Sequence, residues 1–375
     1  LRQADHKPYR YAFFNLSQIR ELGHFVMARR MGMKVEEFGF GFPPRAWGYR
    51  SKKSGTLYSI NWIPLGGFVR VKGESGEHVD DPDSFAAKKG WQRLLVLVAG
   101  VIMNVILAAV LLSIGFMIGL PSVIDDKTPD YARVHDASIK VVSVLPESPA
   151  GQAGFMAGDE IISIDNKVFD TTEQARIYIT QVGPDGAEFS LKREDNSVNI
   201  VRVIPAAIEG LEQPGVGVGL LKTGLISFAP HQAVYHGVIS AGQFTYEVVK
   251  AFGDLFARLV IKQEVAIELS GPVGIAVLTG KVAALGLVYL IQFTAILSIN
   301  LAVLNILPFP ALDGGRVLFL IIEKVRGRVI DQRVEAMVHN FGFLLLMILV
   351  VLVTYRDFVR FGDQIWGTLK SLIGG

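Results

Sequence analysis

Cysteine is absent from this 375-residue sequence, and its absence limits the chemistry open to the chain. There can be no disulfide and no thiolate ligand, so any metal ion must be held by histidine and carboxylate side chains. An excess of one sign of charge is also lacking, because the formal net charge is only +2. No cluster of lysine and arginine is interleaved with aromatic residues. We therefore expect no nucleic-acid partner.

Residues 1–20 lack the apolar core that a signal peptide or a membrane-spanning helix needs. The sequence begins with Leu1, and the stretch that follows is mixed and polar. We therefore expect residues 1–33 to contain an altered or truncated first helix.

Hydrophobic residues, in contrast, make up 50% of the chain. Residues 94–120 and 284–312 are long uncharged runs, and residues 341–358 are a shorter one. About 20 apolar residues cross a bilayer, so each run predicts a membrane-spanning helix. The second run should break near its end, where Pro308 and Pro310 interrupt it. The sequence thus predicts a polytopic α-helical membrane protein.

Residues 121–222 have a different composition, with predicted strands, turn glycines and balanced charge. Within them, residues 140–169 predict a strand, a short helix and a second strand. Residues 148–159 (SPAGQAGFMAGD) resemble the signature of a PDZ domain of the type found in bacterial membrane proteases. That resemblance implies an α/β domain that binds extended peptide as an added strand. A small α+β insertion without this function is the alternative.

Residues 223–283 include a stretch, 227–262, in which apolar and polar positions alternate at helical spacing. This predicts an amphipathic or interfacial helix, although a helix packed in the core explains the pattern equally well. Basic residues are frequent in 29–93 and 316–335, whereas the segment after the first span begins with two aspartates. By the positive-inside rule, these basic segments face the cytoplasm and residues 121–222 face the other side.

Glu21 and His24 form the second part of an H-E-x-x-H motif. In that motif two histidines one helical turn apart bind zinc, and the glutamate acts on zinc-bound water. Arg20 stands where the first histidine would be. A guanidinium stays protonated and has no lone pair for a metal, so Arg20 cannot be a ligand. A lone E-x-x-H is also common on solvated helix faces.

Asp313 lies in the second motif, residues 305–315 (NILPFPALDGG), at the end of a long apolar run. An ionisable side chain at membrane depth is costly and usually faces a polar cavity or a metal. The prolines break the helix, and Gly314 and Gly315 allow close backbone approach, so the carboxylate can be aimed inward. An aspartate that caps the next helix is the alternative.

Together, residues 21–42, 58–73, 94–120, 269–276 and 305–315 resemble the site-2 protease family of intramembrane zinc metalloproteases. The match is best to its regulator of sigma-E protease (RseP) type, here with a single PDZ domain. The resemblance implies a site-2-protease-like membrane core with an inserted PDZ-like domain. It also implies a cytoplasmic-side β element at 34–93 and a cytoplasmic loop at 313–340.

The same resemblance implies Zn²⁺ as cofactor, Glu21 as the general base, and His24 and Asp313 as ligands. The remaining ligand position is Arg20, and this departure puts metal binding in doubt. Because it lies next to the polar start of the chain, we expect one cause for both, such as a frameshift or misassigned start before Glu21. The implied substrate-binding residues are Asn305, Leu65, Gly66, Gly67, Phe68, Val69, Pro308 and Gly314.

Residues 58–72 look like the family's membrane-associated β element, whose edge could pair with an unwound substrate; a plain hairpin on the membrane surface is the alternative. The expected function is intramembrane cleavage of single-span membrane proteins, such as an anti-sigma factor or a signal-peptide remnant. An inactive scaffold that binds peptides through its PDZ-like domain is the other hypothesis. The expected partners also include membrane lipid, and the expected location is the bacterial inner membrane, with the PDZ-like domain outside the cytoplasm.

Overall fold

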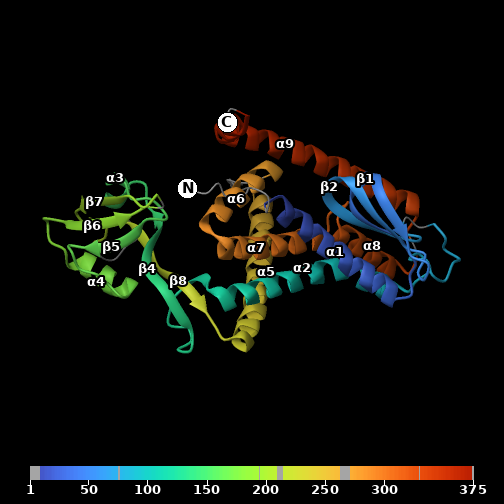
Figure 1. The fold of residues 1–375 in the computed structure, drawn as a ribbon, viewed down its shortest axis with the longest axis horizontal. Helices are drawn as coiled ribbons and strands as arrows, with labels where there is room; N and C mark the ends of the chain where they lie inside the picture. The colour runs from blue at the N-terminus through green and yellow to red at the C-terminus, as the bar shows by residue number, and fades with distance from the viewer. Residues whose placement is uncertain are drawn as a thin grey trace. The chain divides into compact units, whose positions relative to one another are not determined.

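The computed structural model describes residues 9–74, 77–193, 195–208, 214–261, 271–328 and 330–373. It divides into two compact units (Figure 1). Unit 1 comprises Leu1–Ile114 and Val234–Gly375, and unit 2 comprises Gly115–Ala233.

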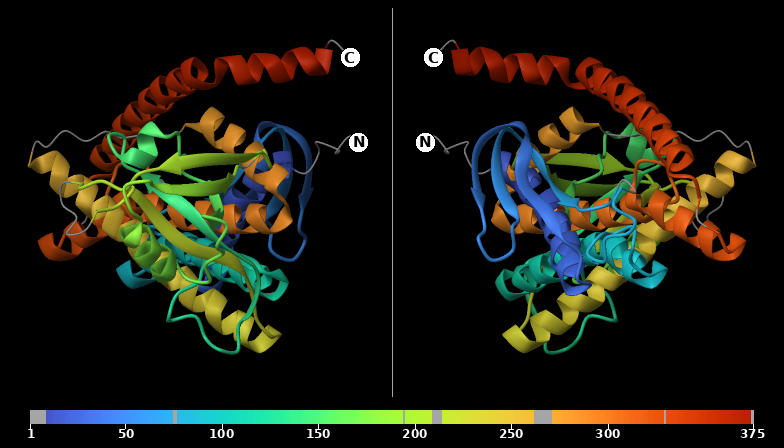
Figure 2. Two further views of the ribbon diagram at one scale, coloured as in Figure 1. Left: turned by 90° about the vertical axis from the view of Figure 1, so that its left-hand side faces the viewer. Right: turned by 90° about the vertical axis from the view of Figure 1, so that its right-hand side faces the viewer.

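Unit 1 begins with α1 (Tyr9–Arg30), in the region expected to hold an altered first helix. The helix ends at Gly32, whose φ of 68° lies in the left-handed region that glycine adopts without strain. Its last turn carries Arg29 and Arg30, which suit the negative end of the helix dipole. α1 lies along the sheet formed by the two strands that follow (Figures 1 and 2).

Strands β1 (Val35–Arg50) and β2 (Leu57–Val71) are antiparallel, and both bend so that each contributes twice to the sheet. The first half of β1 pairs with the start of β2 on one side and with the end of β2 on the other, since Phe38 is paired with both Tyr58 and Val69. The end of β2 therefore forms one edge of this sheet. No other strand in the described part of the chain pairs with that edge.

The loop after β2 is held by Lys72, whose Nζ lies 2.8 Å from a carboxylate oxygen of Asp81 and 2.8 Å from one of Asp83. The hydrogen bond that Lys72 donates lowers the pKa of Asp83. These ion pairs attach the loop to the end of the edge strand.

Three helices of the described residues are long and apolar enough to cross a membrane. They are α2 (Gly90–Ile118), α7 (Leu287–Ile306) and residues Arg333–Gly362 of α9 (Gln332–Ile373). Each overlaps one predicted span. α7 ends at Ile306, before the two prolines, as the sequence indicates.

The bounds expected between these spans need two corrections. The run 284–312 is not one helix, because Gly286, with a φ of 125°, separates α7 from the apolar helix α6 (Pro272–Leu285). The expected cytoplasmic loop 313–340 is largely helical, since it contains α8 (Asp313–Arg326) and the start of α9. Apolar spacing alone did not show where glycine would end a helix.

Helix α5 (Pro230–Val260) covers most of the predicted amphipathic stretch.

A buried carboxylate joins α6 to α9. Asp357 of α9 is 3% exposed, and its Oδ2 accepts a hydrogen bond of 2.7 Å from the backbone N–H of Gly274. Gly271 and Gly274 leave no room for a Cβ beside this carboxylate. Asp357 therefore supplies an acceptor for the unsatisfied N–H groups at the start of α6, where no side chain of α6 itself caps the helix. The predicted motif positions 269 and 270 lie outside the described residues.

Unit 2 is an antiparallel sheet with strand order β3-β8-β4-β5-β6-β7. Its core packs Phe155 against Phe189, whose ring centroids are 5.3 Å apart. The short helix α3 is capped by Ser148, whose side chain accepts the N–H of Gly151. Helix α4 packs against β8. The elements are β3 (Leu120–Val123), β4 (Arg133–Val144), α3 (Pro149–Gln152), β5 (Glu160–Ile164), α4 (Thr172–Gln181), β6 (Ala187–Lys192), β7 (Val198–Val203) and β8 (Val218–Ser227).

Candidate active site

Close packing of α1 on α2 places His24. A Cβ at Gly23 would lie 2.5 Å from the carbonyl oxygen of Ala99, and a Cβ at Gly100 would collide with the His24 ring. Glycine at both positions therefore lets the two helices approach. Nδ1 of His24 lies 2.8 Å from the carbonyl oxygen of Val96. A carbonyl only accepts, so Nδ1 carries the hydrogen, and in the neutral ring Nε2 keeps its lone pair.

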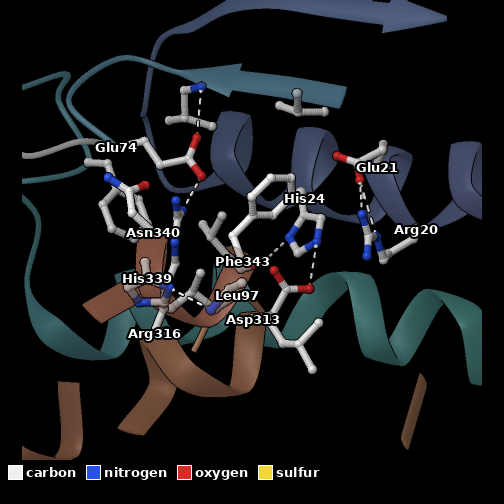
Figure 3. A pocket seen from close by; sticks show the side chains of 16 residues that line it. Arg20, Glu21, His24, Glu74, Leu97, Asp313, Arg316, His339, Asn340 and Phe343 are labelled. Atoms are coloured by element: carbon white, nitrogen blue, oxygen red, sulfur yellow. Dashed lines mark hydrogen bonds and ion pairs between the residues drawn. The ribbon is translucent and has the colours of Figure 1, made fainter. Parts of the chain in front are cut away.

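Asp313 faces that lone pair from the first turn of α8 (Figure 3). Its Oδ2 lies 3.4 Å from Nε2 of His24. Oδ2 is buried without a hydrogen bond within the described part of the chain. In a tetrahedral zinc site, two ligand atoms each about 2.0–2.2 Å from the metal are about 3.4 Å apart. His24 and Asp313 therefore have the separation of two ligands that share one zinc ion.

Arg20 precedes Glu21 on α1 and lies four residues before His24 (Figure 3). Its Nη2 donates to Oε1 of Glu21 at 2.6 Å and its Nε to the same oxygen at 3.1 Å, while Nη1 donates to Oδ1 of Asn305 at 3.1 Å. Glu21 is 6% exposed, so the carboxylate of this ion pair is shielded from water, whereas the Arg20 side chain is 28% exposed. The carboxylate expected to act as base is thus already held by a cation.

The donor set does not complete a catalytic zinc site. Such a site uses three protein ligands and leaves a position for water, whereas the structure brings together two, His24 and Asp313. Within the described residues, no group of three or more His, Cys, Asp or Glu side chains is arranged to hold a metal ion. Arg20, at the third position, has no lone pair to donate.

These side chains line a cavity of about 330 Å³. Beyond Asp313, the same cavity contains an ion pair between Arg316 of α8 and Glu74, which follows β2. The sequence reasoning did not single out either residue. Arg316 stands one turn after Asp313, and that spacing is the signal that could have found it; Glu74 is 242 positions from its partner and gave no such signal.

The expected substrate-binding residues are only partly gathered here. Asn305 is 5% exposed and contacts Arg20, and Val69 lines the cavity. Gly66 lies near α1, because its carbonyl accepts a hydrogen bond of 2.6 Å from Gln18. Gly314 lies against the backbone carbonyls of the residues that end α7. Gly67, Phe68 and Pro308 are close in sequence to these residues but do not line the cavity, and of Leu65 only the backbone, in β2, is described.

His339 is the residue whose place the sequence did not reveal. It lines the cavity with Asp313. Its Nδ1 accepts a hydrogen bond of 2.9 Å from the backbone N–H of Ala311, which has a φ of 77°. A left-handed alanine is strained by roughly 1–2 kcal/mol. Gly342, one turn further along α9, packs directly on Pro310. Helix α9 thus holds the strained turn that precedes Asp313.

We expect His339→Phe to loosen this turn, because the aromatic ring is kept while the acceptor for the Ala311 N–H is lost. An unsatisfied buried N–H costs about 1–3 kcal/mol, and this bond is part-buried, so we expect a loss near the lower end of that range. Hydrogen–deuterium exchange at the Ala311 amide and thermal unfolding in detergent would both report the loss. His339→Asn is the matched control, since its side-chain oxygen takes the place of Nδ1. Equal protection of the Ala311 amide in both variants would contradict the assigned role.

Comparison with known proteins was made against families, individual sequences and solved structures. The model of peptidase family M50 matches residues 11–349. The zinc metalloprotease RasP of Geobacillus kaustophilus is 30% identical over an alignment 425 residues long. The match covers 91% of this chain and 94% of that protein. The regulator of sigma-W protease RasP of Bacillus subtilis is 30% identical over 432 residues, covering 93% of this chain and 96% of that protein.

One solved structure of similar sequence is the PDZ domain of an SdrC-like protein from Listeria innocua. It is 26% identical, and the match covers 22% of this chain and 92% of that domain. Its TM-score is 0.20, too low to support an argument about the fold of unit 2.

Proposed function

Because the chain belongs to peptidase family M50, a family of zinc metalloproteases, we propose that it acts inside the bilayer on single-span membrane proteins and cleaves them by regulated intramembrane proteolysis. The observation that carries this proposal is the group formed by the buried Glu21 and the partly buried His24 and Asp313, next to a strand edge that no other described strand pairs with. The three helices of the described residues that are long and apolar enough to span a membrane support action within the membrane.

The strand edge could hold a substrate in the extended conformation that cleavage within a membrane requires. A transmembrane helix bonds its own backbone internally, so a scissile bond must first be drawn into an extended conformation. The end of β2, residues 67–70, offers such a segment a strand edge that no other described strand pairs with. Val69 of this strand lines the same cavity as Glu21 and Asp313. An extended substrate paired here would run beside the candidate catalytic residues.

Glu21 is proposed as the base that accepts a proton from the attacking water. It is positioned for this by α1, one turn before His24. In the structure one oxygen of its carboxylate, Oε1, is paired with Arg20, so Oε2 is the oxygen proposed to accept the proton.

Unit 2 is proposed to bind peptide as a PDZ-like domain. One edge of β8 pairs with β4 along its length, whereas β3 covers the other edge only over Thr223–Ile226. Residues 218–221 therefore keep an edge to which a peptide strand can be added, near α4. The charge asymmetry supports the proposal that this unit lies outside the cytoplasm of a bacterial cell. An anti-sigma factor or a signal-peptide remnant fits the substrate class proposed here.

A second function is favoured by one observation, the ion pair between Arg20 and Glu21. In this alternative the chain binds membrane segments and peptides but does not cut them. The same strand edge and the same PDZ-like unit would serve it. The two functions differ only in whether bound substrate is hydrolysed.

Site-specific photocross-linking in proteoliposomes would test both. A photoreactive amino acid at Val69 is expected to capture a single-span model substrate, and the same group at Tyr49, on the opposite edge of the sheet, is expected not to. Cleavage products in the same vesicles would establish the protease, and capture without products would establish the scaffold. Equal labelling at both positions, or none, would refute the proposed substrate site.

A further inference from the structure

The structure assigns to Arg20 the position of the third zinc ligand, next to His24 and Asp313. We infer that its guanidinium is a built-in cation that excludes zinc from this chain, while His24 and Asp313 remain as a latent half-site that one substitution completes. The inference rests on the proposed function in taking the His24–Asp313 pair as the reaction centre. It goes beyond that function in assigning the metal-free state to one residue, and it separates the two proposed functions: with Arg20 in place the chain holds a membrane segment without zinc-dependent cleavage, whereas Arg20→His supplies the third ligand that cleavage needs.

The contacts of Arg20 show how completely it takes this place. Its three guanidinium nitrogens donate two hydrogen bonds to Glu21 and one to Asn305. The candidate base and the candidate substrate-binding amide are therefore both occupied by one side chain. A divalent cation that entered would meet a positive charge that is held in place by a carboxylate only 8% exposed.

The two remaining ligand candidates do not depend on Arg20 for their positions. His24 is fixed through Nδ1 by the carbonyl of Val96 on α2. Asp313 is fixed by the turn that Gly314 and His339 hold in place. Removing Arg20 should therefore leave the 3.4 Å spacing between Nε2 and Oδ2 intact.

Position 20 is also directed toward the same point as His24. The two residues are four apart on α1, so they share a helix face. Both side chains approach the same point on α2, because a Cβ added at Gly100 would meet the His24 ring and would lie 2.9 Å from Cγ of Arg20. A histidine at position 20 would therefore point into the space that His24 and Asp313 face.

Zinc content of the purified full-length chain tests the inference without any measurement of cleavage. The natural chain, equilibrated with micromolar zinc and then dialysed, is expected to hold far less than one equivalent. Arg20→His is expected to hold about one zinc per chain and, with cobalt, to give the intense visible absorption of a tetrahedral site. Arg20→Leu, which removes the cation and adds no ligand, is expected to bind more weakly than Arg20→His by on the order of 100-fold.

Three results would overturn the inference. They are a full equivalent of zinc at this site in the natural chain, a folded Arg20→His chain that binds none, and equal affinity in Arg20→His and Arg20→Leu. If Arg20→His does not fold, Arg20→Leu still decides, because lifting the charge alone should raise zinc affinity measurably over the natural chain and no change would overturn the exclusion. Cross-linking at Val69 in the natural chain needs no zinc, so failure of the proposed function would be seen separately.

Discussion

Asp313→Ala, made in the Arg20→His chain, is expected to abolish zinc binding. Among the described residues, Asp313 is the only one whose carboxylate lies within ion-pair distance of His24, with Oδ2 3.4 Å from Nε2. Without it, two histidines remain, and a catalytic site needs three protein ligands. We expect the affinity for zinc to fall by on the order of 100-fold or more, since this substitution removes a direct ligand rather than an outer partner. Metal analysis and cobalt absorption would measure the loss.

Glu21→Gln in the same background is the matched control. Glu21 is proposed as a base and not as a ligand, so this variant should keep its zinc. It should lose cleavage of a model substrate by about 10²–10⁴-fold, the usual contribution of a general base. Retention of tightly bound zinc in Asp313→Ala, or loss of zinc in Glu21→Gln, would show that the roles of the two carboxylates are wrongly assigned.

Gly314→Ala is expected to displace Asp313 by distorting the turn between α7 and α8. A Cβ at this position would collide with the backbone carbonyls of Ile306 and Leu307, and backbone cannot move aside as a flexible side chain can. Overpacking of this kind costs about 1–3 kcal/mol or more. We expect a lower unfolding temperature in detergent and, in the Arg20→His background, weaker zinc binding.

Gly280→Ala is the control for this prediction. Gly280 lies in the apolar helix α6, and a Cβ there would meet nothing within 4 Å. It should be neutral or slightly stabilising, because alanine is the better helix former. If Gly314→Ala were as stable as Gly280→Ala and bound zinc equally well, the close approach at Gly314 would not be what positions Asp313.

Several features of the fold followed from the sequence because they depend on local composition. Long uncharged runs predicted spanning helices, and the prolines after Asn305 predicted where α7 ends. The strand, short helix and strand expected between residues 140 and 169 are present as β4, α3 and β5. The bounds were less accurate where a single glycine decided them, as at Gly286, whose positive φ no hydropathy pattern reports.

The membership in peptidase family M50 could also be predicted from the sequence, since motifs such as residues 305–315 are short and specific. The chemical defect at Arg20 was equally visible, because a guanidinium has no lone pair in any fold. The sequence showed that one ligand is missing. It could not show what the arginine does instead.

Only the tertiary structure decided how the site is built. It brought Asp313 to within 3.4 Å of His24, paired Arg20 with Glu21 and Asn305, and placed His339 against Ala311. These contacts join residues up to 289 positions apart, and such contacts depend on how helices pack, which side-chain spacing along one segment does not encode. The sequence by itself determined the family, the membrane-spanning segments and the missing ligand. The structure determined that Arg20 neutralises the candidate base while the other two ligand candidates keep their places, because each of them is held by its own neighbours.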